Sequence, residues 1–130
     1  MTDRELFEEA VRAAGYSYSK YSKFRVGAAL LTVDGKVYTG CNIENASYSL
    51  TACAERVALF KAVSDGATKF KAIAIAGSST EDFSIPCPPC GACLQVLSEF
   101  CSESLLVLLS KGWFRLSDFL PMRFSGDNIQ

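Results

Sequence analysis

The sequence predicts an α/β fold with three α/β/α layers, in which helices cover both faces of a mixed sheet of about five strands. Two observations support this prediction. Two strand-like segments, 24–32 and 36–42, are separated by Val-Asp-Gly, which is a hairpin signal. After this hairpin, helical patterns alternate with short apolar segments. An antiparallel hairpin followed by strands that alternate with helices implies a mixed sheet.

The chain begins with an amphipathic helix. Thr2 and Glu5 form a capping box, apolar residues follow at helical spacing, and Gly15 can end the helix. A loop rich in Ser and Tyr, residues 15–23, then leads to the hairpin. Segment 43–51 is polar and has no hydrophobic period, so we expect it to be a loop.

The second half of the chain alternates helices and strands. In order, we expect a helix over 53–64, a strand over 71–76, a helix over 90–100, a strand over 105–109, a short edge strand over 113–115 and a last helical turn over 117–120. The segment 105–109 is almost wholly apolar, as expected of a strand buried on both faces. The chain shows no internal repeat, and we expect residues 1–130 to form one domain.

Composition narrows the classes of function. Net charge is −1, from 13 basic and 14 acidic residues without a basic stripe, which argues against a nucleic-acid partner and favours a small, weakly charged substrate. The N-terminus lacks the apolar run of a signal peptide, and the longest apolar run is too short to span a bilayer. We therefore expect a cytoplasmic protein with no membrane partner. In that compartment, the six cysteines favour reduced thiols and a metal site over disulfides.

Two short motifs hold the candidate metal ligands, Thr51–Arg56 (TACAER) and Pro89–Cys93 (PCGAC). Cys90 and Cys93 are a chelating pair at a helix start, and Cys53 at the start of another helix makes a third ligand. Three protein ligands leave the fourth zinc position open to water, as in catalytic sites, whereas four would close a structural site. The chain contains no histidine, so metal-assisted chemistry must use these groups.

Glu55 is the candidate proton carrier beside this metal. It follows Cys53 by two residues, and inside a helix that spacing would point the two side chains about 200° apart. Both can converge only on a metal that lies off the helix end. There Glu55 could take a proton from the metal-bound water and deliver it to a substrate nitrogen. Helix N-termini and the adjacent Arg56 could offset the excess negative charge of three thiolates on Zn²⁺.

Cys87 leaves the ligand set open. Together with Cys90 and Cys93 it resembles the start of an iron–sulfur cluster run, although Leu97 stands where the bacterial pattern requires a further cysteine. A cluster, or a closed zinc site of four cysteines including Cys53, is therefore an alternative. Either would make the chain a non-catalytic metal or cluster module.

With these motifs, the chain resembles the cytidine deaminases of the small homotetrameric type. The resemblance runs from Tyr21 to about Pro121 and includes FRVGAA at 24–29, GCNIENASY at 40–48 and both cysteine motifs. A cysteine at position 53, where related deaminases of nucleotides or nucleic acid often have histidine, favours a free nucleoside as substrate.

The resemblance implies an activity. Zinc-activated water would convert cytidine and 2′-deoxycytidine to uridine and 2′-deoxyuridine with release of ammonia, in pyrimidine salvage. One Zn²⁺ per chain would be held by Cys53, Cys90 and Cys93. Glu55 would be the catalytic proton shuttle, and Arg56 would donate to a zinc-bound thiolate.

The resemblance also implies substrate contacts. Asn42 and Glu44 would hold the ribose hydroxyls, for which their oxygens are suitable acceptors. Phe24 would pack on the nucleoside, and Ala54 would line the substrate site. An aromatic face suits a base, so the residue types agree with these roles.

A homotetramer with shared active sites is implied as well. In this family, neighbouring subunits help to close each site through residues whose counterparts here are Ala46, Tyr48 and Phe124. Leu94 departs from the family, which usually has arginine there, and this removes a polar contact near the third helix. The compact segment 111–114 also predicts a shorter final strand than usual.

A rival within the same scaffold is a deaminase of another aminopyrimidine, such as the antibiotic blasticidin S. The TACAER motif together with an intact pair of Asn42 and Glu44 favours the ribonucleoside.

Overall fold

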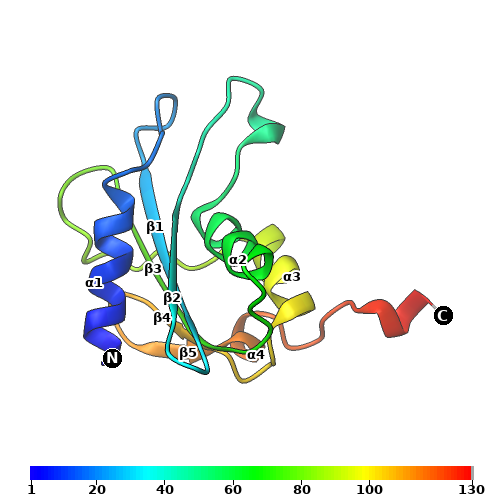
Figure 1. Cartoon of the computed structure of the whole chain (residues 1–130). Helices are drawn as coiled ribbons and strands as arrows, with labels where there is room; N and C mark the ends of the chain where they lie inside the picture. The colour runs from blue at the N-terminus through cyan, green and yellow to red at the C-terminus, as the bar shows by residue number, and fades with distance from the viewer. Residues whose placement is uncertain (130) are drawn as a thin grey trace.

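The computed structural model describes residues 1–129 and contains one mixed five-stranded sheet in the order β2-β1-β3-β4-β5. The strands are β1 (Arg25–Thr32), β2 (Val37–Cys41), β3 (Phe70–Ser78), β4 (Leu106–Leu108) and β5 (Trp113–Arg115). The α-helices are α1 (Asp3–Ala14), α2 (Ala54–Ser64), α3 (Gly91–Phe100) and α4 (Leu116–Phe119), with short 3₁₀ turns η1 (Tyr48–Leu50) and η2 (Gly126–Ile129). Helix α1 covers one face of the sheet, and α2 and α3 cover the other (Figure 1). The predicted three-layer α/β fold is confirmed.

Strand pairing brings three chain segments to one end of the sheet. β1 pairs antiparallel with both β2 and β3, and its register matches Gly27 with Cys41 and Val26 with Gly77. The start of β1 therefore lies beside the ends of β2 and β3. Segments that are far apart in the sequence, around positions 24, 42 and 78, can thus contribute to one site, and Cys87 lies there too, since a Cβ at Gly77 would come within 2.7 Å of its Sγ.

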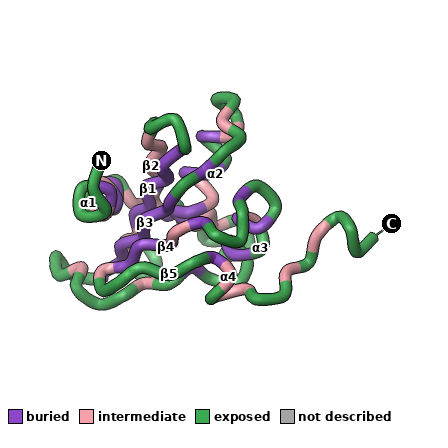
Figure 2. Tube along the Cα trace, turned by 90° about the horizontal axis from the view of Figure 1, so that it is seen from below, coloured by how far each residue is buried: buried purple, intermediate pink, exposed green. Residues whose placement is uncertain are grey.

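The central strands β1 and β3 are largely buried (Figure 2), and apolar residues on both faces of the sheet hold the layers together. Leu6 and Ala10 of α1 pack on one face, and Leu59 of α2 with Leu97 of α3 on the other. A Cβ added at Gly40 would lie only 2.5 Å from the backbone of α2, so this glycine lets α2 rest directly on the sheet. That close contact fixes where the N-terminal end of α2 lies.

Element boundaries differ from the expectation in a few places. β3 is longer than predicted at both ends, because Phe70 and Ser78 pair with residues of β1. The helices that follow the cysteine motifs begin one residue later, since Cys53 and Cys90 are their N-caps. Gly15 ends α1 as expected, with an ordinary right-handed φ of −65°. Within the described residues, none of the helices has the length and apolar character needed to span a bilayer.

Candidate metal centre

Three thiols meet where the N-terminal ends of α2 and α3 come together. Cys53 and Cys90 are the N-caps of these helices, and Cys93 lies in the first turn of α3. The three Sγ atoms lie within 4.8 Å of one another, with 3.9 Å between those of Cys53 and Cys90. Zinc–sulfur bonds of about 2.3 Å in a tetrahedron place the sulfurs about 3.8 Å apart. The cluster therefore fits one zinc ion with little movement.

Arg56 compensates the negative charge of the cluster. Its guanidinium donates to Cys53 Sγ at 3.3 Å and to the Thr51 carbonyl at 3.4 Å. The Cys53 contact is the main reason that the pKa of Arg56 is raised. Among the described residues its buried Nε has no hydrogen-bond partner, and no carboxylate forms a salt bridge with it. The thiolate is thus the main counter-charge of this cation.

In the metal-free protein, the pKa values of Cys53 and Cys93 shift in opposite directions. A hydrogen bond from Cys93 and the contact with Arg56 lower the pKa of Cys53 to about 5. The same hydrogen bond and burial raise the pKa of Cys93 well above its usual range. Zinc binding must therefore release at least the Cys93 proton, so affinity for the metal should rise with pH.

Glu55 is buried beside the thiols, with 5% of its surface exposed. It lies in the first turn of α2, and Cys53 stands just outside the helix as its cap. This arrangement satisfies the geometric condition that any metal lies off the helix end. Burial raises the pKa of Glu55, and the nearby Cys53 thiolate adds to the effect. A carboxyl group of this kind is suited to proton transfer near neutral pH.

In the metal-free protein, Glu55→Gln should raise the free energy of unfolding at neutral pH. Because burial raises the pKa of Glu55, the folded protein favours its protonated form. The resulting contribution to the free energy of unfolding is fully present below the pKa of an unfolded glutamate and is lost as pH rises through the folded pKa. Denaturant unfolding of chelator-treated wild type and variant at about pH 5 and about pH 8 measures this. The gain should be larger at the higher pH, and a gain independent of pH would contradict the assignment.

A cavity of about 190 Å³ opens beside the thiol cluster. Its lining comes from β1, the segment after β2, the start of α2 and the loop before α3: Val26, Asn42, Thr51, Ala52, Cys53, Ala54, Glu55, Cys87, Pro88 and Cys90. Small-molecule pockets usually measure about 300–1,000 Å³. The cavity of one chain is therefore small for a nucleoside and suits mainly its base.

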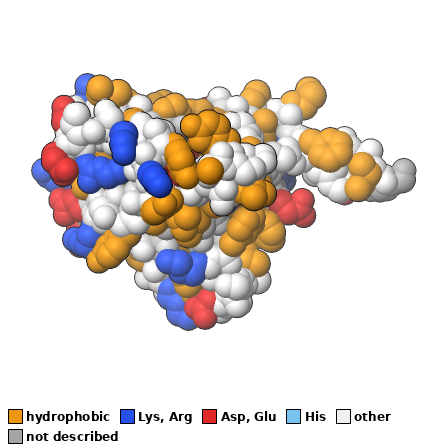
Figure 3. Space-filling view, turned by 90° about the horizontal axis from the view of Figure 1, so that it is seen from above, with side chains coloured by type: hydrophobic (Ala, Val, Ile, Leu, Met, Phe, Trp, Pro, Cys, Tyr) orange, Lys and Arg blue, Asp and Glu red, His pale blue; other side chains and the backbone are white. Residues whose placement is uncertain are grey.

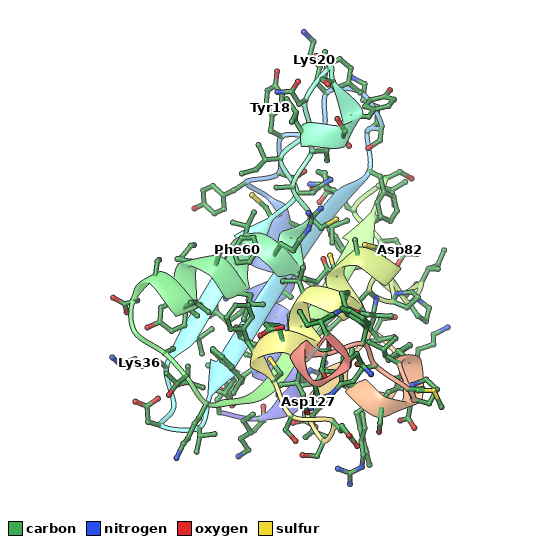
Figure 4. The ribbon with its side chains drawn as sticks, turned by 90° about the vertical axis from the view of Figure 1, so that its right-hand side faces the viewer. Tyr18, Lys20, Lys36, Phe60, Asp82 and Asp127 are labelled. Carbon is green, nitrogen blue, oxygen red and sulfur yellow. The ribbon has the colours of Figure 1, made fainter. Side chains whose placement is uncertain are left out.

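The predicted substrate residues lie at different distances from this cavity. Asn42 and Ala54 line it, whereas Phe24 and Glu44 do not. Phe24 lies at its border, because a Cβ at Gly77 would come within 3.0 Å of both the Phe24 ring and Cys87 Sγ. Figure 4 shows the loop with Tyr18 and Lys20 standing out beyond this end of the sheet.

Asn42 also has a structural role that the sequence did not reveal. Its Oδ1 accepts from the Val26 amide at 2.9 Å and from the Ser17 hydroxyl, and its Nδ2 donates to the Phe24 carbonyl at 2.9 Å. The side chain thus joins the end of β2 to the start of β1. One N–H of its amide group is still available for a ligand.

Glu44 holds the same loop. Its carboxylate accepts from the amides of Tyr21 and Ser22, both at 3.0 Å, and from the Ser22 hydroxyl. These bonds, above all those from Ser22, lower its pKa. The abundance of serine in segment 15–23 was the only sequence signal for these contacts.

Cys87 lies outside the three-thiol cluster. It is half-buried, and burial raises its pKa to about 11, so it stays protonated. This placement favours the open three-thiol set over the closed four-cysteine alternative.

The remaining predicted residues lie away from the cavity. Ala46 is exposed, as are Tyr48 (71%) and Phe124 (57%), and none of the three lines the cavity of its own chain. Leu94 is buried in the apolar core between the sheet and the helices α2 and α3. Packing thus explains an apolar residue at this position.

Comparison with known proteins agrees with this geometry. Residues 1–109 match the family described as "Cytidine and deoxycytidylate deaminase zinc-binding region". A cytidine deaminase of Sporosarcina psychrophila is 48% identical, over 99% of this chain and 96% of the relative. The crystal structure of cytidine deaminase from Burkholderia pseudomallei has a TM-score of 0.87 and 46% identity, covering 95% of this chain and 100% of that one. A blasticidin-S deaminase of Bacillus cereus is less similar, at 28% identity over 95% of this chain and 92% of its own length.

Proposed function

Because this chain belongs to the cytidine and deoxycytidylate deaminase family, we propose that it hydrolyses the 4-amino group of cytidine and 2′-deoxycytidine. The products are uridine or 2′-deoxyuridine and ammonia. The observation that carries this proposal is the cluster of three thiols with buried Glu55 at one cavity. The cofactor is zinc, since the matched region is a zinc-binding region and the cluster suits one ion.

Cys53, Cys90 and Cys93 hold the zinc ion in this proposal. When bound, zinc activates a water molecule by lowering its pKa to roughly 7. Arg56 keeps the Cys53 thiolate in place through the 3.3 Å contact and limits the negative charge of the site. Both helix N-termini add positive potential in the same region.

Glu55 moves the proton. Its carboxylate takes a proton from the attacking water, gives it to N3 of the base and then assists the departure of the amino group. The raised pKa suits this exchange, because a strongly acidic carboxyl would return a proton poorly. Burial also keeps bulk water away from the proton as it moves.

The substrate lies with its base in the cavity and its sugar towards the loop that follows β2. Ala54 lines the cavity at the first position of α2, where an amide has no partner within the helix and can meet an oxygen of the base. Phe24 packs against the nucleoside at the border. The free N–H of Asn42 and the carboxylate of Glu44 hold the ribose hydroxyls.

We further propose that the 130-residue chain acts as one catalytic domain and assembles as a cytoplasmic homotetramer. The cavity of one chain is small for a whole nucleoside, which favours closure by a neighbouring copy. Exposed Ala46, Tyr48 and Phe124 are the residues proposed to make that contact. Reduced thiols at the metal centre suit a reducing compartment.

The experiment that tests the activity is the loss of ultraviolet absorbance of cytidine on mixing with the purified protein, with metal content measured on the same sample. Rapid loss with about one zinc per chain supports the proposal. Bound zinc without loss would make a blasticidin-type substrate the better candidate. A protein that binds no zinc would contradict the ligand set.

Asn42→Ala should weaken binding of cytidine about tenfold while changing binding of the free base cytosine much less, because only the nucleoside has a ribose to hold. The KM for cytidine and inhibition by cytosine measure the two effects. Ser17→Ala is the matched control, since it removes one internal partner of Asn42 and leaves the amide in place. Equal weakening of both ligands in Asn42→Ala would point to a structural role alone.

A further inference from the structure

Cys87 lines the cavity, but it lies outside the three-thiol cluster and has no role in the proposed proton transfer. Its Sγ lies against Gly77 of β3 and beside the ring of Phe24, because a Cβ added at Gly77 would come within 2.7 Å of Cys87 Sγ and 2.9 Å of Phe24 Cε2. Glycine at position 77 thus leaves the room that the thiol occupies. The side chain also packs against the apolar core between the sheet and the helices α2 and α3. Cys87 is therefore a packed part of the cavity wall.

Cys87 and the start of α2 lie on opposite sides of the cavity. In the sheet order β2-β1-β3, the N-terminal end of α2 rests on β2, since a Cβ at Gly40 would come within 2.5 Å of the Ala54 carbonyl oxygen. Cys87, in contrast, rests on β3 at Gly77. Val26 of β1 pairs with Gly77 and lines the cavity between the two. The cavity thus has the start of α2 as one wall and Cys87 as the facing wall.

The wall made by Cys87 is neutral and apolar. Burial raises the pKa of its thiol to about 11, so the sulfur carries no charge near neutral pH. A buried, protonated cysteine behaves as a small hydrophobic residue. Seen from this end of the molecule, apolar side chains gather over the centre of the surface, and charged side chains lie mainly towards its margins (Figure 3). We therefore expect a substrate group that meets Cys87 to be apolar as well.

The loop that carries Cys87, between β3 and α3, is itself held in place. Phe83 packs against the apolar core beneath α1, and the Arg25 guanidinium lies 5.6 Å from the centre of its ring. The Ser110 hydroxyl donates to the Ser84 carbonyl at 2.8 Å, which ties the loop to the segment after β4. A wall that is held in place can discriminate between substituents by size, whereas a mobile wall would adapt to them.

The proposed function orients the base in this cavity. C4 lies at the metal, N3 at Glu55 and the oxygen on C2 at the amide of Ala54, so the N3–C2 edge of the ring faces α2. The C5–C6 edge lies on the other side of the ring and faces Cys87. We propose that Cys87 contacts C5 of the pyrimidine and sets the largest substituent that the enzyme accepts there, an inference that rests on the proposed function. Because the cavity of about 190 Å³ suits mainly the base, one added methyl group should already be crowded.

Substitutions of graded size at Cys87 test this role in the zinc-loaded protein. The measured quantity is kcat/KM for 5-methylcytidine divided by kcat/KM for cytidine. Cys87→Leu should lower this ratio about tenfold, Cys87→Ala should raise it several-fold, and Cys87→Ser, which hardly changes the size, should leave it within about threefold. In each variant, kcat/KM for cytidine should change less than that for 5-methylcytidine. Cys41→Ala is the matched control, since Cys41 is also a partly buried cysteine but does not line the cavity.

A ratio that does not follow the size of the side chain would overturn the proposal, as would equal losses for both substrates, which would indicate a structural role alone. If Cys87→Leu does not fold, Cys87→Ala decides by whether its ratio rises.

Binding of the products gives a readout without turnover, because the affinities for 5-methyluridine and uridine, measured by titration calorimetry, should follow the same order. If the wild type does not turn over cytidine, the proposed function fails, and calorimetry decides the role of Cys87. An affinity ratio that follows size supports that role, and an unchanged ratio or no binding overturns it.

Discussion

Glu55→Gln should leave the fold and the zinc content intact while lowering kcat for cytidine by about 10²–10⁴-fold, the range typical of a lost general acid–base group. Glutamine matches glutamate in size, so the buried position at the start of α2 stays filled. An amide, however, can neither take the proton from water nor pass it to the base. The loss should therefore appear in kcat much more than in KM.

Steady-state kinetics and metal analysis on the same preparation check this result. Glu103→Gln is the matched control, because Glu103 is exposed and lies outside the cavity. Near-normal turnover by Glu55→Gln would contradict the proposed proton transfer. Loss of zinc from that variant would instead show that the carboxylate supports the metal site.

Local sequence signals sufficed to predict most of the architecture. The capping box of Thr2 and Glu5 involves residues three apart, and both reciprocal hydrogen bonds are present. The hairpin signal likewise lies within a few residues, and the strands on either side pair as expected. The helix starts at Cys53 and Cys90 moved by one residue for a local reason, because these cysteines are N-caps, whereas other boundaries moved because of partners distant in the chain. β3, for example, is lengthened by its pairing with β1.

The distinction between local signals and contacts of distant segments applies to the candidate site as well. Cysteines at helix starts and the glutamate beside them could be predicted from spacing alone, and the structure brings the three thiols together. The bonds of Asn42 with Ser17 and Val26 could not, because they join segments 25 and 16 residues apart. Residue type tells what a side chain can bond, but only the fold decides which partner it meets.

At the starts of α2 and α3, the cysteines proposed as zinc ligands are also the N-cap residues of the helices. A cysteine is an unusual N-cap, yet Cys90 Sγ accepts from the Cys93 amide at 3.5 Å and so does part of the work of an oxygen cap. The cap position also directs the thiol off the helix axis. At the opposite end of α3, Arg123 of the C-terminal tail donates to the carbonyls of Ser98 and Cys101. No local sequence pattern predicted this contact.

Removing one thiol of the cluster should abolish zinc binding. In Cys90→Ser, zinc content should fall from about one per chain to near zero after exposure to a chelator, with activity lost in parallel, because a neutral hydroxyl replaces a thiolate ligand. The fold should survive, since a serine oxygen is a better N-cap than sulfur and can still accept from the Cys93 amide. Metal analysis and circular dichroism measure the two properties separately.

Cys87→Ser is the matched control for Cys90→Ser, because it also replaces a thiol sulfur by a hydroxyl oxygen, at a position three residues earlier in the chain. Cys87 lies outside the cluster and stays protonated, so zinc content should not change. Substrate affinity could shift only modestly, through the altered wall of the cavity beside Phe24. Loss of metal from this variant would establish a four-thiol site, and a brown protein would indicate an iron–sulfur cluster. Retention of zinc in a colourless protein leaves the fourth coordination position open for water.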